Sequence, residues 1–183
     1  MSELINCKIL KKQEFTTSDG REWFCALDGN KPVGQVKVIY NLDDKKFTYI
    51  GEWKGNLKEG YFDGYGILKR DSDGMLLKGT FKKGQFKKGK KIYPPSYIYK
   101  SFEGNFKIDE NKIIKKCTTG AQFLDGTFIW NENDKEYTGT FNEAIKYEDG
   151  THQSFDKGCL EWNDDGNSHL KRGTFYNNRK RIL

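Results

Sequence analysis

The residues able to perform acid–base chemistry are few and lie in polar, turn-like sequence. The chain has two histidines, His152 in DGTHQSF and His169 in GNSHLKR. Two carboxylate pairs, Asp43–Asp44 and Asp164–Asp165, fall in predicted turns, where aspartate is favoured because it hydrogen-bonds to nearby backbone. Catalysis requires such groups to converge in a pocket. These positions favour solvated turns, so we expect no catalytic residues and no enzymatic activity.

The sequence also predicts no metal or cofactor site. The four cysteines, Cys7, Cys25, Cys117 and Cys159, are widely spaced, and no CxxC pair occurs. The two histidines do not complete a zinc-binding spacing. No phosphate-binding loop or hydrolase motif is found. We therefore expect reduced thiols, no metal and no cofactor.

The segment FKKGQFKKGKK, from Phe81 to Lys91, is the strongest candidate for binding an anion. Its lysines are Lys82, Lys83, Lys87, Lys88, Lys90 and Lys91. This density of positive charge would suit binding to phosphoinositide headgroups, an acidic protein tail or nucleic acid. Nucleic acid is disfavoured because arginine is scarce and no stacking platform is evident. The alternative is a solvated loop in a lysine-rich chain, and both interpretations stay open.

A five-residue pattern is repeated along the chain and sets the strands that carry the candidate residues. It reads large residue, any residue, glycine, any residue, aromatic residue. Four copies occur at Tyr49–Trp53, Leu77–Phe81, Phe102–Phe106 and Tyr137–Phe141, and a fifth, with its leading leucine displaced by one, ends at Phe175. Each copy follows another strand-like run and a turn such as DSDG, which indicates a hairpin. Five hairpins are predicted, at 38–53, 64–81, 89–106, 124–141 and 156–175.

The spacing across these hairpins sets an expected alignment between copies. Gly66 precedes Leu77 by 11 residues, and Lys91 precedes Phe102 by the same interval. This alignment puts Lys91 where a glycine is expected. A sixth, degenerate copy is predicted in residues 1–35, with Trp23, Cys25 and Leu27 in the triplet positions. The stretch NKIIKKCTTGAQF, in 111–123, is open to an additional hairpin.

The segment YIGEWKGNLKEGYFDGYGILKRDSDGMLLKGTFKKG resembles the MORN (membrane occupation and recognition nexus) repeat. The matching residues are Tyr49, Gly51, Trp53, Gly60, Gly64 and Gly66, and less fully Leu77, Gly79, Phe81, Gly84 and Gly89. The likeness covers about 36–175 and is strongest over 49–89. It implies an all-β, elongated single-sheet solenoid of stacked antiparallel β-hairpins with little helix. It also implies a scaffold at membranes, the cytoskeleton or cilia.

Stacked hairpins would align the triplet glycines in one column and pile the flanking rings on one face. That aromatic layer is either the core itself or a groove for an extended peptide or a helix of a protein partner. The candidate partner-binding residues are Tyr49, Trp53, Phe81, Tyr97, Phe102, Phe106, Tyr137 and Phe141. The preferred function is a non-enzymatic scaffold. The alternatives are anionic-lipid binding through Lys82–Lys91 and, more weakly, a pathogen or viral protein that grips a host partner.

The length of the chain predicts a single repeat domain over 1–183, and its charge is distributed unevenly along the sequence. Residues 1–35 form a degenerate repeat or cap, 36–106 the best repeats, 107–175 degenerate repeats with insertions, and 176–183 a basic tail. Residues 54–116 carry 16 lysines and arginines against 7 acids, whereas 125–169 carry 3 against 11. A linear stack is therefore charged oppositely along its length. The sequence contains no apolar core of a signal peptide and no membrane-spanning run, so we expect a cytoplasmic location, or peripheral attachment to a membrane or the cytoskeleton. Exposed edge strands at the ends of the stack predict dimerisation through a terminal repeat.

Overall fold

The protein is all-β in a computed structural model that describes residues 11–131, 135–141, 145–147, 150–152, 155–164 and 167–174. No helix occurs in those ranges. The strands are β1 (Gln13–Thr16), β2 (Glu22–Asp28), β3 (Lys31–Leu42), β4 (Lys45–Lys54), β5 (Tyr61–Arg70), β6 (Leu76–Lys82), β7 (Gln85–Ile92), β8 (Tyr99–Phe106), β9 (Phe123–Trp130), β10 (Glu136–Phe141), β11 (Ile145–Tyr147), β12 (Gly150–His152), β13 (Phe155–Asp164) and β14 (Asn167–Thr174).

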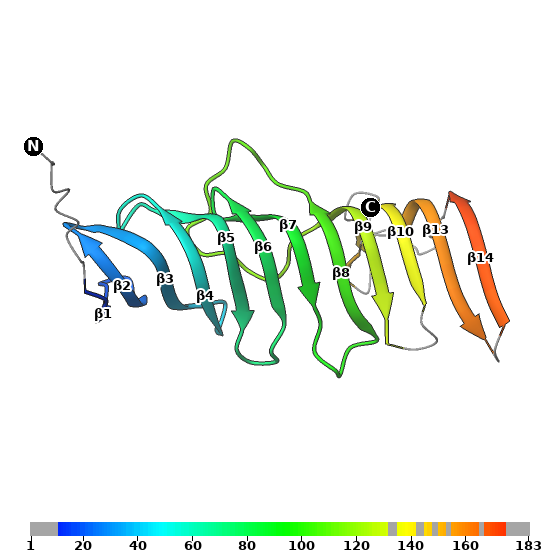
Figure 1. The fold of residues 1–183 in the computed structure, drawn as a ribbon, viewed down its shortest axis with the longest axis horizontal. Coiled ribbons are helices and arrows are strands. Elements are labelled where there is room, and N and C mark those ends of the chain that lie inside the picture. Colours follow the sequence, from blue (N-terminus) through cyan, green and yellow to red (C-terminus); the bar gives the residue numbers. More distant parts are fainter. Residues whose placement is uncertain are drawn as a thin grey trace, which may run out of the picture.

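Twelve of these strands form one open antiparallel sheet in the order β1-β2-β3-β4-β5-β6-β7-β8-β9-β10-β13-β14, and β11 pairs separately with β12. Each neighbour in the large sheet is also the next strand of that sheet in sequence, so the molecule is an elongated strip (Figure 1). The all-β prediction is confirmed. The degenerate first copy is also a hairpin, β1–β2, while residues 1–10 and the tail at 175–183 lie outside the described ranges.

A column of nine paired glycines crosses the sheet from β4 to β14. It runs through Gly51, Gly66, Gly79, Gly89, Gly104, Gly126, Gly139, Gly158 and Gly173. The five triplet glycines occupy alternate positions, as the repeat predicts. The expected alignment of Lys91 with a glycine is wrong, because Gly89 holds that place and Lys91 pairs with Phe102. The paired glycines of this hairpin, Gly89 and Gly104, are 15 residues apart, whereas Gly66 and Gly79 are 13 apart, and the longer connection shifts the phase by two residues.

Glycine is needed in this column because neighbouring backbones come too close for a side chain. A Cβ built on Gly104 would lie 2.6 Å from the Cα of Gly126, and one on Gly79 would lie 2.8 Å from the Cα of Gly89. Real Cβ atoms do not approach other atoms this closely, so a substitution at these enclosed positions would force the strands apart, whereas a Cβ on Gly173 in the last strand would meet nothing within 4 Å. The Tyr49 hydroxyl also lies over this column, 2.5 Å from a Cβ on Gly51.

The core is a continuous spine of aromatic rings on the face that carries the glycine column. Ring centroids 4.7–5.9 Å apart link Trp23, Trp53, Phe62, Phe81, Phe86, Phe106, Phe123, Phe141 and Phe155 in succession. Such contacts add about 0.5–1.5 kcal/mol per pair beyond burial. Each ring touches rings of neighbouring strands, so the stability of every hairpin depends on the next one.

The β8–β9 connection, residues 107–122, forms a strap that runs back towards the earlier hairpins (Figure 1). It contains no strand, so the additional hairpin considered for 111–123 is not formed. The Ile114 amide donates to the Lys83 carbonyl over 2.9 Å, and the Tyr40 hydroxyl donates to the Cys117 carbonyl over 2.6 Å. Cys117 and Thr119 of the strap are buried. The strap therefore closes part of the core of the N-terminal repeats.

Candidate functional site

Most of the predicted partner-binding residues belong to the core. Tyr49, Phe81, Phe102, Phe106 and Tyr137 are at most 2% exposed, and Trp53 and Phe141 pack against them half-buried. Of the eight, only Tyr97 is exposed, at 38%. Of the two alternatives for the aromatic layer, the structure favours the core, and it corrects the expectation that these rings line an open groove.

Two tyrosines of the layer make the same internal hydrogen bond in different repeats. The Tyr49 hydroxyl donates to the carbonyl of Glu52, and the Tyr137 hydroxyl donates to the carbonyl of Thr140, both over 2.8 Å. Each ring also stacks on a phenylalanine of the neighbouring strand, with centroids 3.8 and 4.0 Å apart. Burial raises the pKa of both hydroxyls. These tyrosines are structural anchors of the repeat.

The six lysines of Lys82–Lys91 do not form one surface. Lys82 pairs with the Glu110 carboxylate at 2.8 Å, Lys83 donates to the Glu110 carbonyl, and Lys90 lies 3.9 Å from Glu103. Strand alternation turns Lys88 and Lys90 to the outer face of the sheet, opposite the core. Lys87 and Lys88 are exposed, but Lys91 is buried. The predicted anion-binding group is thus divided between a turn, the outer face and the core.

Lys91 is the exception in the core. It is 8% exposed, and its Nζ lies 5.0 Å from the centre of the Tyr93 ring and 5.4 Å from that of Phe123. Burial, with a smaller contribution from the charge of Arg70, lowers its pKa to about 8. No described carboxylate pairs with it.

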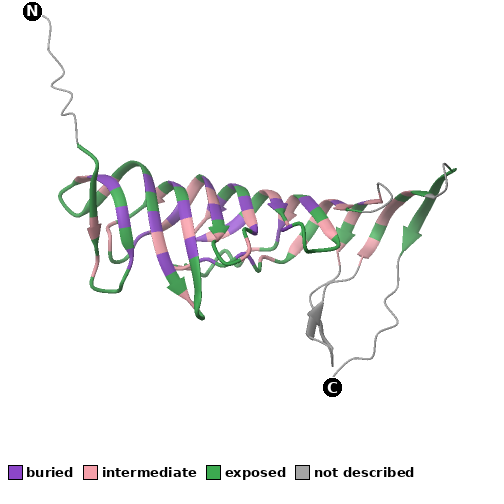
Figure 2. Cartoon of the chain, turned by 90° about the horizontal axis from the view of Figure 1, so that it is seen from below, coloured by how far each residue is buried: buried purple, intermediate pink, exposed green. Residues whose placement is uncertain are grey.

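The outer face of the N-terminal strands carries exposed apolar side chains between lysines. One cross-strand row, which we name the outer row, runs through Phe24, Lys37, Ile50, Ile67, Lys78 and Lys90. Phe24 and Ile50 are 38% and 45% exposed, and Tyr65 beside the row is 49% exposed. Figure 2 shows this alternation of buried and exposed positions along the ribbon. Its length and its mixture of exposed apolar and basic side chains make the outer row a candidate contact surface.

At the N-terminal end of the same face lies a surface hollow of about 380 Å³. It is lined by Glu14, Phe15, Thr16, Glu22, Trp23, Phe24, Lys37 and Ile39. Because Phe24 and Lys37 belong to both features, the hollow extends the outer row to the first strands. The volume lies at the lower end of the range of small-molecule sites.

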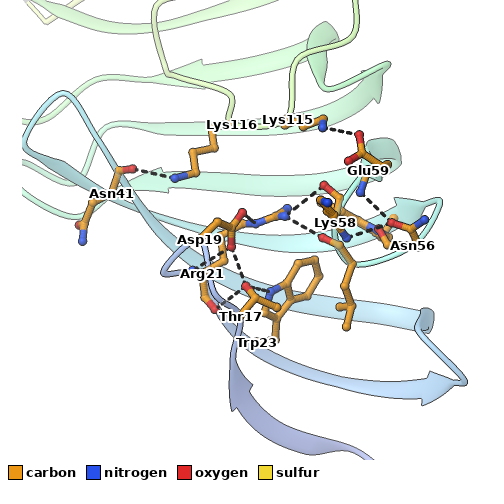
Figure 3. Close-up of polar contacts among 12 residues, drawn as sticks. Thr17, Asp19, Arg21, Trp23, Asn41, Asn56, Lys58, Glu59, Lys115 and Lys116 are labelled. Atoms are coloured by element: carbon orange, nitrogen blue, oxygen red, sulfur yellow. Dashed lines mark hydrogen bonds and ion pairs between the residues drawn. The ribbon is translucent and has the colours of Figure 1, made fainter.

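Arg21 connects the first hairpin to the β4–β5 turn (Figure 3). Its guanidinium donates to Asp19 and to the Leu57 carbonyl, each over 2.7 Å, and lies over the rings of Trp23 and Trp53. One terminal nitrogen, Nη1, is buried without a hydrogen bond among the described atoms. The neighbouring Lys115–Glu59 ion pair ties the strap to the same turn. The arrangement holds the N-terminal repeat on the stack.

The candidate acid–base groups stay apart where they are described. Asp43 and Asp44 form a turn with positive φ, and His169 stacks on Trp162 at 5.0 Å. His152 lies in β12, but its side chain is outside the described set, as is residue 165. The described cysteines, Cys25, Cys117 and Cys159, are free thiols. Cys7 is not described.

The described residues lack two features that would point to other functions. They contain no group of three or more histidine, cysteine, aspartate or glutamate side chains arranged to hold a metal ion. They also contain no helix with the length and apolar character needed to cross a membrane. Comparison with protein-family models found no match to this chain, and comparison with curated proteins found none either.

Proposed function

We propose that the protein is a non-enzymatic, MORN-like repeat scaffold that binds a protein partner through the outer row. The support for the repeat is the in-register column of nine glycines and the ring spine beside it. Repeats that stack in this way offer a long surface on a stiff support. The core rings are buried, so we assign partner binding to the opposite face.

The observation that carries this proposal is the exposure of Phe24, Ile50 and Tyr65 beside lysines on a regular sheet. Large apolar side chains on the solvent face of a strand contribute little to the fold, and a patch of them favours association. The lysines between them favour a partner whose binding segment is acidic and carries apolar side chains. Either an extended peptide or an amphipathic helix would meet these requirements.

The test compares two matched variants on the same face. Ile50→Asp places a charge in the outer row, and Thr138→Asp places one at the equivalent position of the C-terminal repeats. Proteins captured by the wild type are identified by mass spectrometry, purified and measured by titration. We expect at least tenfold weaker binding to Ile50→Asp and unchanged binding to Thr138→Asp. A purified partner that binds both variants as tightly as the wild type would refute the assignment.

A second candidate is binding to an anionic membrane surface. It is favoured by the lysines that share the outer face of β3–β7, namely Lys37, Lys69, Lys78, Lys88 and Lys90. Each lysine near an anionic bilayer contributes about 1 kcal/mol. Flotation on phosphatidylcholine vesicles with and without phosphoinositide, at two salt concentrations, tests it. Lys69→Glu/Lys78→Glu should abolish flotation, and an absence of salt-sensitive flotation of the wild type excludes this candidate.

A further inference from the structure

Lys91 occupies a position that is apolar in the neighbouring strands. The cross-strand row that contains it consists of Tyr49, Leu68, Leu77, Lys91, Phe102, Phe128 and Tyr137. The other six side chains are at most 4% exposed. A leucine or phenylalanine at this position would complete the row, so the lysine is not explained by packing.

Among the described residues, no carboxylate forms an ion pair with Lys91. Its Nζ lies over the rings of Tyr93 and Phe123, which stabilise a cation only partly. The charge of Arg70 disfavours the charged form of Lys91. Arg70 itself is paired with Asp73. A buried ammonium that lacks a carboxylate costs several kcal/mol, so such groups normally acquire an anionic partner or lose their proton.

The same end of the core face is rich in hydrogen-bond donors. Arg70 donates to the Tyr97 hydroxyl over 3.3 Å, and the rings of Tyr97 and Tyr99 lie 5.8 and 5.6 Å from that of Tyr93. Tyr97 is 38% exposed, so this end of the face reaches solvent. Two cations and three phenols thus gather here, and Asp73 is the carboxylate that pairs with Arg70.

We infer that Lys91 anchors an anion-binding site, flanked by Arg70, Tyr93 and Tyr97, that takes the carboxylate or phosphate group of a small molecule. The anion supplies the charge that the protein leaves unmatched, and the aromatic rings pack against the remainder of the ligand. Burial lowers the pKa of Lys91, and a bound anion would oppose this by stabilising the charged ammonium. The site lies on the face opposite the outer row and does not depend on partner binding there.

The first test measures thermal midpoints in inorganic phosphate, benzoate or chloride at constant ionic strength and pH 7. We expect phosphate or benzoate, but not chloride, to raise the midpoint of the wild type with saturation. A response to one anion only identifies its group as the preferred one. Lys91→Met should weaken the apparent affinity at least tenfold, whereas Lys88→Met, an exposed change in the same strand, should leave it within twofold. No saturable response, or an equal response in Lys91→Met, overturns the site.

The second test asks whether the chain provides the anion itself. The β9–β10 connection includes residues 132–134, which lie outside the described set and include two acids. The Lys91 Nζ pKa is measured by NMR in chloride for the wild type and for Glu132→Gln/Asp134→Asn. We expect a value below 10.5 in both proteins and a rise when the anion binds. A wild-type value at or above 10.5 that falls in the double variant would overturn the inference.

Discussion

The N-terminal and C-terminal repeats share one register but differ in what surrounds them. The core residues of β3–β7 lie beneath the strap, and several are fully buried, including Tyr40, Phe62 and Leu68. In β13 the described side chains are half-buried or exposed, and in β14 every one is exposed. The same glycine–aromatic element therefore does not fix how well a repeat is buried. The burial of a repeat depends on having a neighbouring strand on each side and on being covered by the strap.

The outer row shows the same contrast in its chemistry. In β2–β7 it carries Phe24, Ile50 and lysines, while its continuation in β8–β13 consists of Glu103, Thr127, Thr138 and Cys159. Because the sheet follows sequence order, the basic and acidic segments separate along the strip, as the charge distribution predicts. One architecture thus presents a basic, apolar surface at one end and an acidic, hydroxyl-rich surface at the other.

The largest predicted effect comes from filling the glycine column where it is enclosed. Gly104→Ala should destabilise the protein by about 3 kcal/mol, because the new methyl group would meet the backbone of Gly126. The matched change in the C-terminal edge strand, Gly173→Ala, meets no atom within 4 Å and should cost about 1 kcal/mol through its φ of 135° alone. Urea denaturation of both variants measures the difference. Equal losses would mean that backbone proximity does not explain the column.

The second effect has the opposite sign and concerns Lys91. Between its folded pKa of about 8 and its ordinary value of 10.5, the unfolded chain binds more protons than the folded one. Stability should therefore rise with pH across this window, and the full penalty of up to about 3 kcal/mol applies below pH 8. Without a bound anion, Lys91→Met should be more stable than the wild type at pH 7, with the advantage shrinking towards pH 10.

Other groups that titrate in the same pH range are controlled for by comparing the wild type with Lys91→Met at each pH. Burial raises the pKa of the Cys117 thiol to about 12, so its contribution is lost as pH rises above the ordinary value of 9.0. That contribution is common to the wild type and Lys91→Met, and it cancels in the difference between their free energies of unfolding. A difference that does not change between pH 7 and pH 10 would contradict the assigned shift.

The third effect tests whether the strap distinguishes the two halves. Tyr40→Phe removes the hydrogen bond to the Cys117 carbonyl and leaves that buried oxygen without this donor. The expected loss of stability is about 1–2 kcal/mol. Hydrogen exchange should become faster at Ile114 and in the amides of β3 and β4, but not in β13. Uniform acceleration over the whole sheet would show that the strap is not a local cover.

Much of this fold is predictable from the sequence, and the reasons for the exceptions are physical. The triplets at Gly51, Gly79, Gly104 and Gly139 identify a shared column because only close backbone approach explains a glycine between large residues in a strand. The predicted phase at Lys91 is wrong because Gly89 and Gly104 lie 15 residues apart, two more than Gly66 and Gly79, so an equal spacing misplaces the glycine of this hairpin. The path of 107–122 follows long-range contacts such as Tyr40–Cys117, which local patterns do not encode.

The candidate surfaces were less predictable than the fold. The alternation of side chains along a strand predicts two faces, but it does not tell which face is buried in the core. The sequence is therefore consistent with either a partner-binding or a core role for the aromatic layer that contains Tyr49 and Phe102. The lysine run from Lys82 to Lys91 predicts one patch, but strand alternation puts Lys88 and Lys91 on opposite faces of the sheet. The sequence does not reveal the outer row, because its members come from six different strands, β2 to β7. They become neighbours only when the register of strand pairing is known.

The smallest effect compares the two tyrosine anchors directly. Tyr49→Phe and Tyr137→Phe each delete a hydroxyl that donates to a carbonyl three residues later. Each should cost about 0.5–1.5 kcal/mol, because both tyrosines are fully buried and each released carbonyl loses its donor. The two residues lie in repeats that share no contact, so their losses should add within about 0.5 kcal/mol in the double variant. A larger departure would show that the ring spine transmits strain over several hairpins, and the two halves would then be one cooperative unit rather than a chain of neighbours.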